Sequence, residues 1–169
     1  MSNFPTRRAW LGATLATAVW LGGCAVAPQA GGLAQIDALL KGADPGMGLS
    51  LSLQATTVTI GDPVRALVST NRPAYLYLYQ VAGDGQRVNA LFPNAVDGAN
   101  YIAAGSLMLP RDTWRMSARG PAGQSYFVVV ATAEPMDLNL IARETAAGRI
   151  PVPARAYAAA MSPLREVAR

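Results

Sequence analysis

From residue 49 onward, hydrophobic positions along the chain alternate with polar ones. Leu49, Leu51 and Leu53 are separated by Ser50 and Ser52, which is the spacing of a strand with one buried face. Later segments are rich in β-branched and aromatic residues and are bounded by glycine, proline, asparagine or aspartate. The pattern predicts strands over residues 49–53, 56–60, 64–70, 75–79, 88–92, 106–109, 113–117 and 126–132.

Short strands at this regular spacing predict the fold class. About seven or eight of them in one domain are typical of a mainly β fold, an immunoglobulin-like antiparallel β-sandwich, which we place over residues 48–135. The Asp84-Gly85 pair between two apolar segments predicts a tight hairpin, because glycine adopts the positive φ that such turns need. The almost continuously apolar segment 127–131 predicts a central strand that is buried on both faces.

Helical spacing occurs on either side of the predicted sandwich. Residues 33–40 predict a short helix within segment 24–47, which is otherwise rich in alanine, glycine and proline and is interpreted as a tether. Residues 138–147 and 154–161 predict two more short helices with prolines between them. We therefore expect a C-terminal helical extension over residues 136–169, with a frayed end.

The N-terminal residues have the organisation of a bacterial export signal. Arg7 and Arg8 are followed by an apolar segment over residues 9–21 and by two glycines before Cys24, the only cysteine of the chain. The apolar segment, of about 13 residues, is shorter than the roughly 20 residues that a membrane-spanning helix needs. The pattern therefore predicts a cleaved signal peptide over residues 1–23.

The sequence Leu21-Gly22-Gly23-Cys24 resembles the lipobox of bacterial lipoproteins. The resemblance implies cleavage between Gly23 and Cys24, acylation of the Cys24 thiol and amino group, and attachment to the membrane through these acyl chains. Ala25 at the next position implies the outer membrane, and we expect the domain at its periplasmic face. A plain signal peptide and a lone buried cysteine are the alternatives. The motif over residues 6–11 also resembles a twin-arginine signal, so the export route stays open.

Charge and composition narrow the classes of function. Removal of residues 1–23 takes away two of the 14 basic side chains, and the remaining 12 face 10 acidic ones without forming a cluster. A nucleic-acid partner is therefore not expected. The chain has no histidine, which excludes Ser-His and Cys-His nucleophiles and the usual zinc ligand. We expect no enzyme activity, cofactor or metal, with a carboxylate-based hydrolase as the remaining alternative. Its candidate carboxylates are Asp62, Asp84, Asp97, Asp112 and Glu134.

Four short motifs follow one another along the predicted strands. They are Ile60-Gly61-Asp62; Ala74-Tyr75-Leu76-Tyr77-Leu78 followed by Asp84-Gly85; Leu91-Phe92-Pro93-Asn94; and Gly120-Pro121-Ala122-Gly123 before the strand that begins at Tyr126. In this order they resemble a bacterial domain family of unknown function, over roughly residues 50–135. The family occurs fused to protein kinases and in envelope lipoproteins linked to surface and secretion systems. The resemblance implies a β-sandwich with a binding or scaffolding role and without catalytic residues.

Two features carry candidate binding functions. Tyr75, Tyr77 and Tyr79 share one face of a strand, so they form an outward partner-binding row if the intervening leucines face the core. The alternative is that the tyrosines themselves line the core. The loop with Asn94, Asp97 and Asn100 has oxygen ligands for calcium but lacks the regular spacing of a calcium loop, which makes an ordinary polar loop the alternative.

The sequence as a whole predicts a lipid-anchored envelope protein. Its expected role is that of a non-enzymatic module that binds or scaffolds an envelope protein, as an accessory of a secretion or surface-assembly system. The alternative is a periplasmic sensor of a small ligand or glycan, with the loop over residues 94–105 and Trp114 lining its site.

Overall fold

The computed structural model describes residues 32–169. The predicted signal peptide, its cleavage position at Gly23 and the predicted lipid attachment at Cys24 lie outside the described residues. The described residues form two helices and nine strands. They are α1 (Gly32–Lys41), β1 (Leu49–Leu53), β2 (Thr57–Thr59), β3 (Ala66–Thr70), β4 (Ala74–Ala82), β5 (Val88–Phe92), β6 (Tyr101–Ile102), β7 (Gly105–Leu109), β8 (Gly123–Thr132), α2 (Leu138–Ala146) and β9 (Tyr157–Val167).

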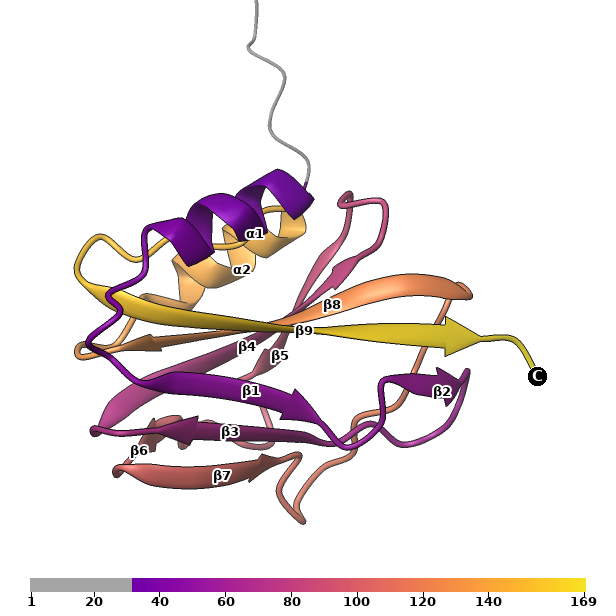
Figure 1. Ribbon diagram of the computed structural model, residues 1–169, viewed down its shortest axis with the longest axis horizontal. Coiled ribbons are helices and arrows are strands. Elements are labelled where there is room, and N and C mark those ends of the chain that lie inside the picture. The colour runs from indigo at the N-terminus through magenta and orange to yellow at the C-terminus, as the bar shows by residue number, and fades with distance from the viewer. Residues whose placement is uncertain (1–31) are drawn as a thin grey trace, which may run out of the picture.

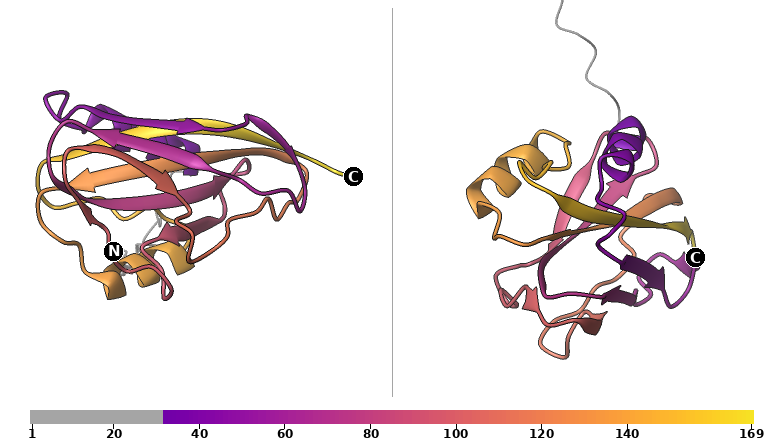
Figure 2. Two further views of the ribbon diagram at one scale, coloured as in Figure 1. Left: turned by 90° about the horizontal axis from the view of Figure 1, so that it is seen from below. Right: turned by 60° about the vertical axis from the view of Figure 1, so that its left-hand side comes forward.

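These elements form three layers, and the predicted β-sandwich is confirmed. The smaller sheet has the strand order β1-β3-β7, and the larger sheet has the order β2-β9-β8-β4-β5, with β6 also paired to β4. Both helices lie on one face of the larger sheet, which we call its outer face, and the smaller sheet lies on its inner face (Figure 1). The right-hand view of Figure 2 shows this order of layers around β9.

Strand β4 contributes side chains to two hydrophobic cores, one on each face of the larger sheet. Leu76 and Leu78 point between the two sheets, whereas Tyr77 and Tyr79 point toward the helices, because successive side chains of a strand alternate between its faces. All four side chains are fully buried. The inner core contains Val68, Phe92, Leu109, Phe127, Val129 and Leu164, and the outer core contains Ile36, Leu39, Val81, Val128, Val130 and Ile141.

The C-terminal segment differs most from the sequence prediction. The helix predicted over residues 154–161 and the frayed end are wrong, because residues 157–167 form β9. Residues 157–166 of this strand pair with β8 in antiparallel register. The alanines at 158–160 favour a helix locally, but pairing with β8 and packing against the two cores decide their conformation. Pro163 is tolerated because β2 pairs only with residues 165–167, so that β9 has a free edge beside the proline.

The domain boundaries change accordingly. The predicted helix near residue 36 is confirmed as α1, but Ile36 and Leu39 are buried against the larger sheet, so α1 belongs to the domain rather than to a tether. The folded unit therefore runs from α1 to β9 and exceeds the predicted 48–135. The helix predicted over residues 138–147 is confirmed as α2, whose first turn is capped by the Asp137 side chain.

Three smaller differences concern the strands. The sandwich is not wholly antiparallel, because β2 and β9 run parallel. Residues 113–117 form no strand but a single bridge between Pro63 and Ser117, and the predicted loop after residue 95 contains the short strand β6. Neither helix in the described part of the chain is long and apolar enough to cross a membrane.

Candidate functional site

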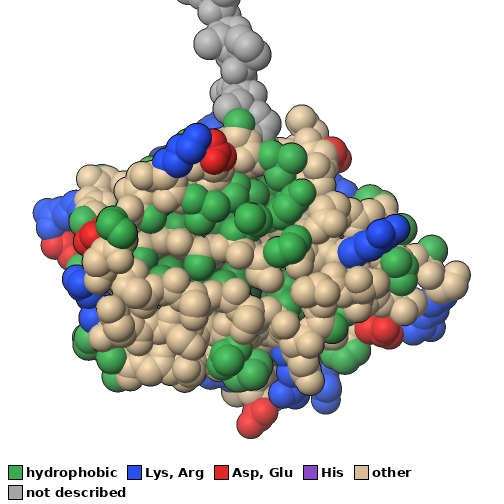
Figure 3. Space-filling model, viewed as in Figure 1, with side chains coloured by type: hydrophobic (Ala, Val, Ile, Leu, Met, Phe, Trp, Pro, Cys, Tyr) green, Lys and Arg blue, Asp and Glu red, His purple; other side chains and the backbone are tan. Residues whose placement is uncertain are grey.

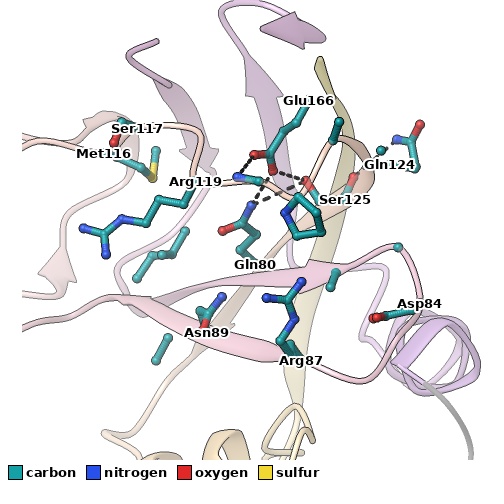
Figure 4. Close-up of a pocket in the computed structure, with 18 of the residues that line it drawn as sticks. Gln80, Asp84, Arg87, Asn89, Met116, Ser117, Arg119, Gln124, Ser125 and Glu166 are labelled. Atoms are coloured by element: carbon teal, nitrogen blue, oxygen red, sulfur yellow. Dashed lines mark hydrogen bonds between the residues drawn. The ribbon is translucent and has the colours of Figure 1, made fainter. Parts of the chain in front are cut away.

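A cleft of about 800 Å³ opens at one end of the sandwich, on the inner side of the larger sheet. One wall is the β4–β5 hairpin, which contributes Gln80, Asp84, Arg87 and Asn89. The other wall is the irregular segment over residues 114–124, which precedes β8. Figure 4 shows Asn89 of β5, and Arg87 just before that strand, projecting into the cleft, which has Gln80 at its base. This cleft is the candidate binding site.

The base of the cleft is organised by one buried carboxylate, that of Glu166 on β9. Its Oε1 atom accepts hydrogen bonds from Gln80 Nε2 at 3.0 Å and from Ser125 Oγ at 3.1 Å, and its Oε2 atom accepts one from the Gly120 amide at 2.8 Å (Figure 4). Glu166 is only 3% exposed. A buried charge is costly unless it is hydrogen-bonded. The three donors meet that requirement and tie β4, β8 and the irregular wall to β9.

Two glycines fit the close packing around the cleft. Gly120 has a positive φ of 67°, and a Cβ atom there would lie 2.9 Å from Ile60 Cδ1. At Gly83, in the hairpin, a Cβ atom would lie 2.2 Å from the carbonyl oxygen of Gln124. A larger residue at Gly83 would force the two walls apart, whereas one at Gly120 would be strained by its positive φ and would press on Ile60.

The rim of the cleft is basic. Arg87, Arg115 and Arg119 line it, and all three are exposed. Among residues 32–169, none of them forms an ion pair. The exposed carboxylate at the rim, that of Asp84, accepts a hydrogen bond from the Gln86 amide at 2.9 Å within its own turn. Because like charges gather here without partners, the rim attracts anionic groups.

Trp114 connects the cleft with the predicted loop over residues 94–105. Its indole nitrogen donates to Asp97 Oδ2 at 3.1 Å, and Arg111 Nη1 donates to Asp97 Oδ1 at 2.5 Å. Asp97 is 7% exposed, and the Arg111 guanidinium also lies 5.3 Å from the centre of the Phe92 ring. The loop is therefore fastened to the cleft wall through Asp97.

The polar residues of that loop serve its own folding. Asn94 Oδ1 accepts hydrogen bonds from the amides of Val96 and Asp97, at 2.9 and 3.0 Å, and Asn100 Nδ2 donates to the Leu76 carbonyl at 3.1 Å. The Asn94 side-chain oxygen and both carboxylate oxygens of Asp97 therefore accept hydrogen bonds from protein donors, as in an ordinary polar loop. Within the described part of the chain, no cluster of three or more acidic, histidine or cysteine side chains is placed to hold a metal ion.

The hypothesis that Tyr75, Tyr77 and Tyr79 form an outward partner-binding row is wrong. Tyr77 and Tyr79 are buried beneath the helices, and Tyr77 accepts a hydrogen bond of 2.6 Å from the Met136 amide. The Tyr79 hydroxyl has no hydrogen-bond partner among the described residues, and burial raises its pKa. Tyr75 alone stays partly exposed, with its ring centre 4.9 Å from that of the exposed Tyr101.

The five candidate carboxylates of a hydrolase lie on separate turns. Asp62 accepts from the Thr59 amide at 3.2 Å, Asp84 lies in the β4–β5 hairpin, and Asp97 is held by Arg111 and Trp114. Asp112 is exposed in the turn after β7, and Glu134 pairs with Arg155 before α2.

Comparison with known proteins addresses the family resemblance. Residues 57–135 match a family model described as a domain of unknown function (DUF4384). Among curated proteins, no match to the chain was found. The DUF4384 segment begins at β2 and ends just after β8, so it contains the hairpin, the basic rim and the irregular wall of the cleft. Glu166 lies outside the DUF4384 segment, in β9, whose first part was predicted as a helix and whose last residues were predicted as a frayed end.

Sequence analysis did not find this cleft. Its arginines are separated by up to 32 positions in the chain, from Arg87 to Arg119, and Glu166 follows much later. The motif Gly120-Pro121-Ala122-Gly123 lies in one wall of the cleft, and Trp114, which the sequence suggests as part of a sensor site, also lines it. The role of Trp114 in ligand binding stays a prediction.

Proposed function

We propose that this protein is a lipid-anchored module of the bacterial cell envelope that binds an acidic segment of another envelope protein in the cleft. It does so without catalysis, and its concrete role is that of an accessory in a secretion or surface-assembly system. The observation that carries the proposal is the set of Arg87, Arg115 and Arg119 on the cleft rim, none of them ion-paired within residues 32–169.

The chemistry of the rim favours a carboxylate-rich ligand. Arginine presents a planar fork of donors that matches a carboxylate, and exposed guanidinium groups also accelerate the encounter with an oppositely charged partner. Asn89 and Ser117 add neutral hydrogen-bonding groups between the arginines. A cleft of about 800 Å³ has room for several residues of an extended chain.

The N-terminal sequence supports the proposed location of the protein in the cell envelope. The basic start, the apolar segment and the Leu21-Gly22-Gly23-Cys24 motif together have the pattern of a lipoprotein signal. Two or three acyl chains on Cys24 would attach the protein stably to a membrane, whereas a single chain would not. Ala25 favours the periplasmic face of the outer membrane.

Site-specific photocrosslinking in intact cells tests the proposal. A photoreactive residue at Asn89, inside the cleft, is expected to give one discrete crosslinked envelope protein. The same residue at Ser52, exposed on the smaller sheet, is the control and is expected to give none. Equal products from both positions, or no product from Asn89, would contradict the proposal. In the Cys24→Ser variant, which cannot be acylated, the Asn89 product is expected to decrease.

One observation favours a second function, that of a sensor for a small anionic ligand such as a carboxylate-bearing glycan. Trp114 lies in the cleft wall beside Arg115, and an indole ring can pack on a sugar ring. Trp114 is the only tryptophan after residue 23, so in the processed protein its fluorescence reports the cleft alone. A change in its emission on addition of peptidoglycan fragments would favour the sensor, and an unchanged emission would contradict it.

A further inference from the structure

The outer face of the larger sheet is only partly covered by the helices. α1 packs over the first part of β9 and α2 over β5. Beyond α1, Met161 is 37% exposed, Pro163 is exposed and Tyr126 is half-buried. Figure 3 shows hydrophobic side chains gathered on this face, below α1, with charged side chains around them. Together with the 45% exposed Leu33 of α1, these residues form what we call the outer patch: Leu33, Tyr126, Met161 and Pro163.

The outer patch lies next to the point at which the described chain begins. The Gly32 amide donates to the Gly85 carbonyl at 2.9 Å, and a Cβ atom on Gly32 would lie 2.8 Å from Val81 Cγ1. Val81 is paired with Tyr126, and Tyr126 is paired with Pro163. Neighbouring strands are about 4.8 Å apart, so Pro163 lies only about 10 Å from Val81 across the sheet. The patch therefore extends directly from the first residue of α1.

The length of the preceding chain places this end of the domain near a bilayer. We propose that the outer patch is the surface with which the domain rests on the lipid bilayer that holds its own acyl chains. The inference rests on the proposed acylation of Cys24. Seven residues lie between Cys24 and Gly32, and even a fully extended chain spans at most about 29 Å over the eight steps from one to the other. That is less than the diameter of a domain of this size, about 35–40 Å.

The chemistry of the outer patch suits a bilayer surface. Tyrosine is favoured at the boundary between hydrocarbon and head groups, because its ring is apolar and its hydroxyl is polar. Methionine, leucine and proline add apolar area without a polar group that burial would leave unpaired. The exposed Arg165, on the same face of β9 as Met161 and Pro163, can meet anionic head groups.

This orientation has a consequence for the cleft. Tyr126 and Pro163 point to the outer face of β8 and β9, whereas their neighbours Ser125 and Leu164 point to the inner face. Ser125 and Glu166 form the base of the cleft, so the cleft and the outer patch lie on opposite faces of the same strands. A domain that rests on the outer patch presents its cleft away from the bilayer, toward partners in the periplasm.

Spin labelling of the acylated protein in vesicles tests the inference. Cys24 is the only cysteine, so once it is acylated a Met161→Cys substitution provides the only thiol for a nitroxide. Met108→Cys is the matched control, because Met108 is 41% exposed and lies on the outer surface of the smaller sheet. The vesicles contain phosphatidylethanolamine and phosphatidylglycerol. The measured quantity is the ratio of nitroxide accessibility to oxygen, which enriches in lipid, over accessibility to a water-soluble nickel complex.

The inference predicts that reconstitution raises this ratio at position 161 and leaves it unchanged at position 108. An unchanged ratio at both positions would overturn it. Protection of position 161 that arises only when other envelope proteins are added would also overturn it, and would assign the patch to a protein partner. Mass spectrometry of the purified protein reports acylation of Cys24 independently. An unmodified Cys24 would refute the proposed anchor, whereas an acylated Cys24 with a water-exposed position 161 would refute the outer patch alone.

Discussion

The Oε2 atom of Glu166 accepts a 2.8 Å hydrogen bond from the backbone amide of Gly120, although the two residues are 46 positions apart. This contact joins the last strand of the larger sheet to the irregular wall of the cleft. The other oxygen of the same carboxylate accepts from Ser125 on β8, the strand beside β9, and from Gln80 on β4, the next strand of the sheet. The shape of the cleft therefore depends on a residue that lies after the segment matching the family model.

A Glu166→Gln variant is expected to lose both stability and the form of the cleft. The new amide would place N–H groups where the carboxylate now accepts, so Gln80 and Ser125 must reorient or lose their hydrogen bonds, and the charge that strengthens the Gly120 contact is lost. We expect the free energy of unfolding to fall by about 2–3 kcal/mol, as measured by urea denaturation. Glu134→Gln is the control, because that exposed carboxylate pairs only with Arg155 and should leave stability unchanged. Equal midpoints for both variants would show that Glu166 has no structural role.

Two tyrosines on the same strand should respond to phenylalanine with opposite signs. Tyr79→Phe removes a buried hydroxyl that has no partner among the described residues, and should raise the free energy of unfolding by about 1 kcal/mol. Tyr77→Phe leaves the Met136 amide without its acceptor and should lower it by about 1–2 kcal/mol. Thermal or chemical denaturation of the two variants distinguishes them. A loss of stability in both would indicate that the Tyr79 hydroxyl is hydrogen-bonded in solution.

Stability at alkaline pH should depend on Tyr79. Burial raises the pKa of Tyr79, so the folded protein keeps this proton above pH 10, where the unfolded chain releases it. Below about pH 10 this titration therefore does not affect the free energy of unfolding, and as the pH rises further the free energy of unfolding decreases. Burial also raises the pKa of Tyr157 and acts in the same direction. Between pH 9 and 11.5, Tyr79→Phe should lose less stability than the natural chain, and parallel curves would contradict the assignment.

Asp97 should control the environment of Trp114. In Asp97→Asn, one carboxylate oxygen is replaced by an N–H donor that opposes either the Arg111 guanidinium or the Trp114 indole. We expect a loss of about 1–3 kcal/mol in stability and a red shift of the Trp114 emission, because the ring is less firmly packed. Asp112→Asn, an exposed neighbour in the chain, is the control and should change neither quantity.

Much of the sandwich could be predicted from local pattern. β1 alternates leucine with serine, and the Asp84-Gly85 hairpin has Gly85 at a φ of 70° as the turn requires. β4 could not be oriented in the same way, because its leucines and its two central tyrosines are equally buried. When both faces of a strand are covered, alternation no longer identifies the inner face. The local pattern predicts both helices, but it does not reveal that they pack over the tyrosines.

The candidate site was less accessible to prediction than the fold. Alanine at 158–160 favours a helix, and only pairing with β8 makes this segment a strand. Without that strand, the local pattern predicts a frayed end at Glu166 rather than a buried carboxylate. The rim arginines come from the turn before β5 and from the irregular wall, and no spacing in the sequence indicates that they converge. A site whose residues are distant in the sequence and are brought together by the sheet topology can be identified only from the folded structure.

The measurement that tests the central claim most directly is the yield of the Asn89 photocrosslink when the charge of the rim is reversed. The double variant Arg87→Glu/Arg119→Glu is compared with Arg143→Glu, an exposed arginine of α2 that lies outside the cleft. If the cleft holds an acidic segment of an envelope protein, the crosslink disappears in the double variant and persists in Arg143→Glu. A crosslink of unchanged yield in the double variant would contradict the role of the arginine rim.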